Sequence, residues 1–335
     1  MYISPMKKIV KPLLAWYAVN ARELPWRSDP SPYHVWLSEI MLQQTRVDTV
    51  IPYYKRFLEE VPTVETLADI PEERLLKLWE GLGYYSRARN LQKAAKQIAG
   101  RTFPATFDEI RRLPGVGDYT AGAIASIAFG LPEPAVDGNV LRVLSRVRGS
   151  RRDITEPKLK EEFRRDLREI YPPEQCSEFT QALMELGATV CYPNGVPDCS
   201  RCPWQAFCVC RQEGSWREIP VKSSAKARKI EKRIVQIALC NGKVALRKRP
   251  SKGLLANLWE FPHILEGEEL PVAGETTTVV LQTKHIFSHL EWHMSAVITH
   301  VPEPVNGFEW VQTDELEKEY ALPAAFNAFK ALLKK

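Results

Sequence analysis

A single carboxylate stands inside an apolar stretch near the beginning of the chain. Residues 35–47 (VWLSEIMLQQTRV) are apolar almost all round, which is typical of a buried helix, and Glu39 lies within them. Burial raises the pKa of a carboxyl group and favours its protonated form, which can act as a general acid. The residues support equally well a structural ion pair between this carboxylate and an arginine such as Arg22, Arg27 or Arg46.

A second carboxylate, Asp137, lies at the beginning of another expected helix. Apolar residues and Gly138 frame it in the segment EPAVDGNVLR (residues 133–142). A helix start stabilises the ionised form of a carboxylate. Taken by itself, an aspartate at such a place is most often an N-cap, and the residues alone favour that interpretation.

Five of the seven cysteines lie between positions 191 and 210, and this grouping predicts a metal site. The chain opens with no apolar leader, so we expect a cytoplasmic protein in which disulfides are the least expected use of these thiols. The gaps between the first four are seven, two and five residues, and Cys210 follows as a spare thiol; the four are Cys191, Cys199, Cys202 and Cys208.

A glycine-rich turn occurs at residues 113–124 (LPGVGDYTAGAI) and leads into a helix of small residues. Its glycines allow a tight turn and a close approach by a partner, and the free amides of the next helix start can bind an anion. The pattern predicts a helix-hairpin-helix, which grips a DNA phosphate through Gly115, Val116 and Gly117 without reading bases. A simple turn between two helices would also explain two glycines.

The elements that must position these residues fall into two parts. Up to about residue 216, Pro and Gly punctuate short stretches with helical periodicity, which predicts an all-α part. Beyond it, residues 234–239 and 244–246 around Asn241-Gly242 predict a β-hairpin, residues 276–281 and 294–299 predict further strands, and residues 324–332 predict a final helix. We therefore expect a helical domain at 1–216, a linker at 217–230 and an α+β domain at 231–335.

Length and composition agree with this division. A chain of 335 residues with 44% hydrophobic and 26% charged residues predicts about two globular domains and excludes extensive disorder. No apolar run approaches the roughly 18 to 20 residues that a membrane helix needs. The net charge of +5 is mild, but basic residues gather at 142–152 and 222–249, where they suit phosphate contacts or a solvated helix face and linker.

The order of hairpin, aspartate and cysteines resembles the helix-hairpin-helix DNA glycosylases of the endonuclease III superfamily over residues 7–216. More specifically, WLSEIMLQQT (residues 36–45) and LPWR (residues 24–27) resemble the adenine DNA glycosylases of the MutY type. The resemblance implies a six-helix barrel module followed by an iron-sulfur module. Lyase members of the superfamily carry a lysine after the hairpin, whereas this chain has Tyr119 there and no lysine nearby. A phenol cannot form an imine, so we expect base removal without strand cleavage.

The resemblance also implies roles for single residues. Glu39 would protonate adenine on N7, Asp137 would stabilise the oxocarbenium ion, Tyr119 would lie beside the sugar, and Asn139 would orient the aspartate or the water. The adenine pocket would be lined by Arg22, Leu24, Trp26, Arg27 and Gln181, although Trp26 fits a plain core position equally well.

Other residues are implied to contact DNA. Gln44 and Tyr84 resemble residues that wedge into the base stack when the target base swings out, and Thr45 and Leu82 accompany them. Arg87 and Arg89 suit phosphate contacts or solvated charges.

In the family, the four cysteines hold a structural 4Fe-4S cluster. The usual first gap is six residues and here it is seven, which a one-residue insertion around residues 194–197 explains. A four-thiolate zinc site stays open as a minority alternative.

The carboxyl-terminal part resembles the Nudix-like second domain of the same enzymes through GLLANLWEFP (residues 253–262) and FSHLEW (residues 287–292). It lacks the glutamate cluster of a working Nudix hydrolase, so the resemblance implies recognition of 8-oxoguanine by Phe287, Ser288 and His289. Histidines at 285, 289 and 293 have the four-residue spacing of a metal-binding helix, but the strand-like run after His293 argues against one.

We therefore expect a monofunctional adenine DNA glycosylase of base excision repair. Its partner would be double-stranded DNA with adenine opposite 8-oxoguanine or guanine, and we expect a monomer with no membrane association. The competing hypotheses are an endonuclease III-like lyase acting on oxidised pyrimidines, a non-catalytic lesion-binding protein, and a Nudix nucleotide hydrolase.

Overall fold

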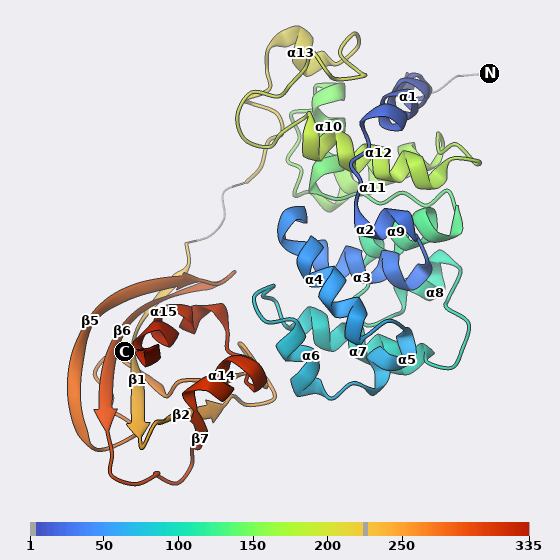
Figure 1. The fold of residues 1–335 in the computed structure, drawn as a ribbon. Helices are drawn as coiled ribbons and strands as arrows, with labels where there is room; N and C mark the ends of the chain where they lie inside the picture. Colours follow the sequence, from blue (N-terminus) through green and yellow to red (C-terminus); the bar gives the residue numbers. More distant parts are fainter. Residues whose placement is uncertain (1–4, 224–226, 335) are drawn as a thin grey trace. The chain divides into compact units, whose positions relative to one another are not determined.

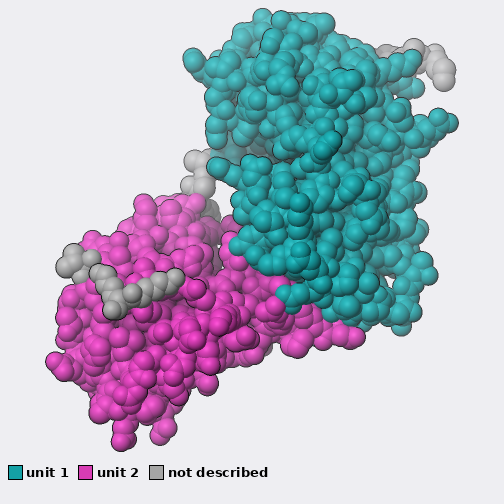
Figure 2. All heavy atoms as spheres, viewed as in Figure 1, with its two compact units in different colours: residues 1–68, 90–224 teal, residues 69–89, 225–335 magenta. Residues whose placement is uncertain are grey.

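The computed structural model describes residues 5–223 and 227–334 (Figure 1). Residues 1–4, 224–226 and 335 lie outside the described residues, and 224–226 fall within the expected linker and the second basic stretch. The chain divides into two compact units, one of residues 1–68 and 90–224 and the other of residues 69–89 and 225–335 (Figure 2). Segment 69–89 thus groups with the carboxyl-terminal part, which no sequence pattern indicated.

The first unit is helical, as the Pro and Gly punctuation predicted. Its helix α7 begins in segment 69–89 and continues into the first unit. The elements are η1 Pro5–Ile9, α1 Val10–Asn20, α2 Pro25–Ser28, α3 Pro32–Leu42, α4 Val47–Glu60, α5 Val64–Asp69, α7 Ser86–Ile98, α8 Phe107–Arg111, α9 Asp118–Phe129, α10 Gly138–Arg148, α11 Pro157–Arg168, α12 Cys176–Thr189 and α13 Val209–Glu213.

The helix that carries Glu39 ends earlier than the sequence predicted. We expected it to run to Val47, but α3 ends at Leu42 and a separate helix, α4, begins at Val47. The break falls on the polar residues 43–46, where Gln44 has a positive φ of 59°. A left-handed residue cannot continue a right-handed helix, so this turn places Gln44 at the surface.

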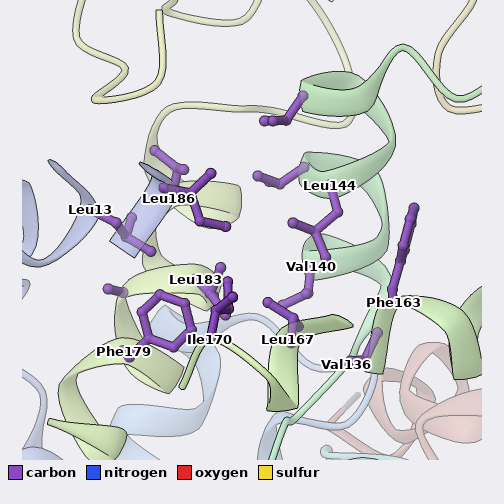
Figure 3. Packing of buried hydrophobic residues seen from close by; sticks show 14 of the residues in the cluster. Leu13, Val136, Val140, Leu144, Phe163, Leu167, Ile170, Phe179, Leu183 and Leu186 are labelled. Carbon is purple, nitrogen blue, oxygen red and sulfur yellow. The ribbon is translucent and has the colours of Figure 1, made fainter. Parts of the chain in front are cut away.

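One hydrophobic core of the first unit lies between α1, α10, α11 and α12 (Figure 3). Leu13, Leu144, Phe163, Leu167 and Phe179 are all at most 1% exposed there. This core holds the amino-terminal end of α10 in place, and with it the residue that precedes the helix, Asp137.

A close helix contact brings the Asp137 segment to the helix after the glycine-rich turn. A side chain at Gly122 in α9 would overlap the carbonyl oxygen of Pro134. Only glycine permits this approach, so the small residues of α9 allow segment 131–137 to lie directly against it.

The second unit contains a seven-stranded mixed sheet in the order β3-β2-β1-β6-β5, in which β4 also pairs with β1 and β7 with β2. Strands β1 and β6 are parallel, and the other pairs are antiparallel. The elements are α6 Glu72–Leu78, β1 Lys229–Cys240, β2 Lys243–Lys248, β3 Trp259–Glu260, β4 His263–Leu265, β5 Glu275–Ile286, β6 Leu290–His300, β7 Glu309–Gln312, α14 Thr313–Glu319, η2 Ala324–Phe326, α15 Asn327–Lys330 and η3 Ala331–Lys334.

The strand predictions are confirmed. The β1–β2 hairpin turns at Asn241 and Gly242, whose φ values of 47° and 77° are those of a type I′ turn. Strands β5 and β6 extend beyond the predicted ranges and place His285 and His293 on paired strands. A metal-binding helix through these histidines is therefore excluded.

The predicted final helix is a series of short helical turns on the concave face of the sheet (Figure 1). Phe326 and Phe329 are fully buried there, in a cluster with Phe261 and Trp292. Within the described residues, no helix has both the length and the apolar character needed to cross a membrane.

Candidate active site

The buried carboxyl group of Glu39 meets a side chain from a second helix. Glu39 in α3 is 5% exposed, and its Oε2 accepts a hydrogen bond of 2.7 Å from the hydroxyl of Tyr119 in the first turn of α9. Burial raises the pKa of Glu39 to about 7; the Tyr119 bond opposes this shift and the nearby Asp137 adds to it. At neutral pH, a large fraction of Glu39 therefore carries a proton.

Two arginines considered as partners of Glu39 are engaged elsewhere. Arg22 Nε lies 2.6 Å from Glu185 Oε1, and Arg27 Nη2 lies 2.8 Å from Glu185 Oε2. Burial alone would raise the pKa of Glu185, but the hydrogen bonds from both arginines hold it below the ordinary value. The structural ion pair therefore belongs to Glu185 in α12.

Sequence reasoning missed Glu185, whose side chain is 1% exposed. The signal that could have found it is the one that identified Glu39, an acid inside an apolar run, here ALMELGA at residues 182–188. Tyr17 was also missed: its hydroxyl donates to Gln181 over 3.3 Å, and the Arg27 guanidinium lies 5.6 Å from its ring centroid.

Asp137 is the N-cap of α10, as the residues alone indicated. Its Oδ1 accepts from the Val140 backbone N–H and its Oδ2 from Asn139 Nδ2, both at 2.8 Å. Burial raises the pKa of Asp137, and these two hydrogen bonds oppose that rise. Because its charge also raises the pKa of Glu39 and of Tyr119, the three groups lie within electrostatic reach of one another.

A buried arginine, Arg142, donates a hydrogen bond to the side chain of Asn139. Arg142 Nη2 donates to Asn139 Oδ1 over 2.8 Å and to the Gly187 carbonyl over 2.9 Å. Its Nε donates to the carbonyl of Cys191 over 2.9 Å. The orientation of the Asp137 carboxylate thus depends on the loop that begins the cysteine group.

Of the residues expected to line an adenine pocket, Arg22 and Arg27 share Glu185, and Arg27 and Gln181 both contact Tyr17. Leu24 and Trp26 are each 7% exposed, and the Trp26 ring packs edge-on against Tyr54 at 5.4 Å. The half-buried Arg27 lowers the pKa of Glu39, which links this group to the carboxylate pair.

The glycine-rich turn has the backbone that its sequence indicated. Gly115 has a φ of 78°, and the Val116 N–H donates to the Leu113 carbonyl over 3.0 Å. Gly115 and Gly117 are exposed, whereas Val116 is buried at 8% exposure. The turn therefore presents backbone rather than side chains at the surface.

Gln44 and Tyr84 share an unusual backbone. Both have positive φ, 59° and 47°, and both side chains are exposed. Residues held in this sparsely populated region cluster at functional sites. Thr45 is half-buried and Leu82 is buried.

The two interpretations offered for Arg87 are both wrong. It is 8% exposed, and its Nη2 donates to the carbonyls of Leu82 and Gly83 over 2.9 and 3.1 Å. Burial lowers its pKa to about 10. Arg87 therefore stiffens the turn that carries Tyr84. Arg89 donates to the Ala256 carbonyl over 2.8 Å within the second unit.

The loop between β5 and β6 lines a cleft in the second unit. The cleft, of about 560 Å³, is bordered by Tyr84 and by Phe287, Ser288 and His289. Ser288 Oγ lies 3.5 Å from the Tyr84 hydroxyl, and Ser288 and His289 are exposed while Phe287 is half-buried. The structure thus brings Tyr84 and these three loop residues together.

All five clustered cysteines line one cavity of about 300 Å³ in the first unit. Burial raises the pKa of Cys202 to about 12 and that of Cys208 to about 11. Coordination to a metal would displace the proton of such a thiol. Among the described residues, no three acidic, histidine or cysteine side chains converge closely enough to hold a single ion, whereas zinc needs its sulfur ligands at about 2.3 Å from one point. Four cysteine thiolates around one cavity are the donor set of a 4Fe-4S cluster.

Comparisons with known proteins agree with both parts of the chain. Residues 37–173 match the family described as HhH-GPD superfamily base excision DNA repair protein, and residues 234–332 match the NUDIX domain. The adenine DNA glycosylase of Buchnera aphidicola subsp. Acyrthosiphon pisum is 33% identical, over 87% of this chain and 86% of that protein. Those of Arabidopsis thaliana and Homo sapiens are each 37% identical, over 87% and 75% of this chain. The chain spans only 53% and 56% of the length of these two relatives.

Solved structures resemble the helical part. A thermostable thymine-DNA glycosylase has a TM-score of 0.56 at 28% identity, covering 62% of this chain and 97% of its own. A non-covalent endonuclease III–DNA complex has a TM-score of 0.54 at 26% identity, covering 65% of this chain and 100% of its own.

Proposed function

The chain belongs to the adenine DNA glycosylase family, and from this premise we propose that it hydrolyses the N-glycosidic bond of adenine in double-stranded DNA. The target is adenine opposite 8-oxoguanine or guanine, and the DNA strand stays intact. The observation that carries the proposal is the Tyr119–Glu39 hydrogen bond beside Asp137. It lies where a carboxyl group with a pKa of about 7 is within electrostatic reach of a second carboxylate that has a different hydrogen-bond environment.

The two carboxylates have different roles in the proposed reaction. Since the Tyr119 hydroxyl occupies Oε2 of Glu39, Oε1 is the oxygen from which a proton passes to N7 of the flipped adenine. The bond between the sugar and the base then breaks, and its electron pair leaves with adenine. Water adds to the resulting oxocarbenium ion, and its surplus proton returns to a carboxylate.

Asp137 supplies the negative charge that the cationic intermediate needs. Its two oxygens are held by Val140 and Asn139, so the carboxylate is oriented before the charge develops. Tyr119 lies within reach of both carboxylates and carries no amine, so the sugar forms no imine with it. This is the reason to propose a monofunctional enzyme.

The surrounding residues bind the substrate. Arg22, Leu24, Trp26, Arg27 and Gln181 form the adenine pocket, and the backbone of residues 115–117 binds a DNA phosphate. Gln44 and Tyr84 enter the base stack, Thr45 and Leu82 support them, and Phe287, Ser288 and His289 contact the opposite 8-oxoguanine.

Cys191, Cys199, Cys202 and Cys208 would hold a 4Fe-4S cluster through their thiolates, and the bound cluster would fix the conformation of their loop. The Cys191 carbonyl accepts a hydrogen bond from Arg142, which also donates to Asn139. A bound cluster that holds this loop would therefore also help to hold Asn139 and Asp137 in position.

The test is a single-turnover assay on three duplexes, carrying adenine opposite 8-oxoguanine, adenine opposite guanine, and thymine glycol opposite adenine. We expect adenine loss that appears as a strand break only after alkali. Breaks at thymine glycol without alkali, together with a borohydride-trapped adduct, would contradict the proposal and favour lyase chemistry.

A further inference from the structure

A group of charged and aromatic side chains lies in the sheet of the second unit, which does not contain the two candidate catalytic carboxylates. It comprises Glu231 and Arg233 of β1, Glu260 of β3, His263 of β4 and Trp292 of β6, here called the Trp292 cluster. The side chains of Glu231 and Arg233 are 14% and 18% exposed, and those of Glu260 and His263 are 1% and 3% exposed. Trp292 is 1% exposed.

Hydrogen bonds join the cluster in a chain. Arg233 Nη2 lies 2.6 Å from Glu231 Oε2, and Trp292 Nε1 donates to the same oxygen over 3.1 Å. Arg233 Nη1 lies 2.9 Å from His263 Nδ1. An arginine can only donate, so Nδ1 accepts, and the ring proton on Nε2 donates to Glu260 Oε2 over 2.9 Å. Arg249 adjoins the same chain of bonds: its Nη1 lies 2.5 Å from Glu260 Oε2, and its guanidinium lies 6.0 Å from the Trp292 ring centroid.

The cluster fixes the Trp292 ring, and the ring in turn meets the β5–β6 loop. The Arg233 guanidinium lies 4.5 Å from the indole centroid, and the His263 ring lies 5.2 Å from it. Phe287 packs edge-on against the indole at 4.9 Å and 70°. The Phe287 N–H donates to the Leu290 carbonyl over 2.9 Å and closes the turn.

Phe287 is thus the anchor of the loop, because it is half-buried while Ser288 beyond it is exposed. Buried charged groups are a poor source of stability, since apolar side chains of similar volume often serve as well. A polar network in which every donor and acceptor has a partner instead holds its side chains in one conformation.

We infer that the Trp292 cluster positions the loop of residues 287–289 and thereby sets the preference for 8-oxoguanine over guanine opposite the adenine. Arg233 is the positioning residue, because it contacts Glu231, His263 and Trp292 at once and lies closer to the Trp292 ring centroid, at 4.5 Å, than Arg249 does at 6.0 Å. The inference rests on the proposed function of the loop.

The experiment compares Arg233→Met with Lys232→Met in the full-length chain. Lys232 is the next residue of the same strand, but it is 70% exposed and pairs with the exposed Glu266 over 3.4 Å. Both variants lose one positive charge, and only Arg233→Met loses the contact with the Trp292 ring. Single-turnover rates on adenine opposite 8-oxoguanine and opposite guanine give the preference as a ratio.

We expect Arg233→Met to lower this ratio about two- to twelvefold, the range that corresponds to one edge-to-face ring contact, with an unchanged rate opposite guanine. Lys232→Met should keep the wild-type ratio. Arg233→Lys keeps the charge beside Glu231 and should restore part of the preference; it also serves as the test variant if Arg233→Met does not fold, and it should then show a reduced ratio. Thermal unfolding of each variant measures general destabilisation, which would lower the rates on both duplexes by the same factor.

The outcomes distinguish a failure of the positioning role of the Trp292 cluster from a failure of the proposed recognition role of the loop. If the wild-type protein prefers 8-oxoguanine and both Arg233 variants keep the full ratio, the positioning role is overturned while the proposed function stands. If the wild-type protein removes adenine equally from both duplexes, the recognition role of the loop is itself wrong, and the inference falls with it.

Discussion

Replacing Glu39 by glutamine should separate catalysis from stability. Burial raises the pKa of this carboxyl group from 4.5 to about 7. The folded protein therefore holds a proton that the unfolded chain releases between these pH values, and stability falls as pH rises through this window. With 1.36 kcal/mol for each pKa unit, the ionised carboxylate costs the fold about 3 kcal/mol above pH 7. Below pH 4.5 this cost disappears.

Glutamine has nearly the same shape, carries no charge and can still accept the Tyr119 hydrogen bond. We expect Glu39→Gln to lose about a thousandfold in the single-turnover rate, since a general acid contributes about 10² to 10⁴. The same variant should unfold at a higher urea concentration at pH 9, with a gain approaching about 3 kcal/mol, and show little gain at pH 4.5.

The matched control is Glu185→Gln, which also replaces a buried glutamate of the first unit. Glu185 is held by Arg22 and Arg27, so its loss leaves two cations without their carboxylate and should destabilise the protein at pH 7. Urea midpoints followed by tryptophan fluorescence at pH 4.5, 7 and 9 test both variants. A Glu39→Gln protein no more stable than wild type at pH 9 would refute the account of the buried acid.

Four further outcomes are expected. The single-turnover rate of adenine removal should fall about tenfold for each pH unit above 7, as Glu39 loses its proton, and a flat profile between pH 7 and 9 would contradict this. Asp137→Asn keeps an acceptor for the Val140 N–H but loses the charge and the acceptor for Asn139 Nδ2, so the single-turnover rate should fall about 10²- to 10³-fold. Ser288→Ala removes one exposed hydroxyl at the cleft and should reduce the ratio of rates opposite 8-oxoguanine and guanine by about fivefold, the size of one hydrogen bond. The Cys202→Ser protein should contain less iron per chain than wild type, whereas the Cys210→Ser protein should retain its iron. Loss of iron in Cys210→Ser would mean that Cys210 is one of the ligands.

The sequence by itself predicted the helical character of the first part, the strands of the second part and the settings of the two carboxylates. An acid in an apolar run indicated a buried Glu39, and an aspartate before Gly138 indicated the N-cap at Asp137. The Asn241-Gly242 turn and the alternating strands around it were likewise readable, because each depends on residues close together in the chain. Local periodicity and turn chemistry carry such information.

Which side chains meet was decided by the tertiary structure. Tyr119 reaches Glu39 across 80 positions of sequence, and Arg22 and Arg27 reach Glu185 across 163 and 158. An apolar pattern says that a charged group is buried, but it does not say which opposite group the packing brings to it. The early end of α3, the burial of Arg87 and the grouping of segment 69–89 with the strands escaped prediction for the same reason: each depends on contacts made by the folded chain, which a local pattern does not contain.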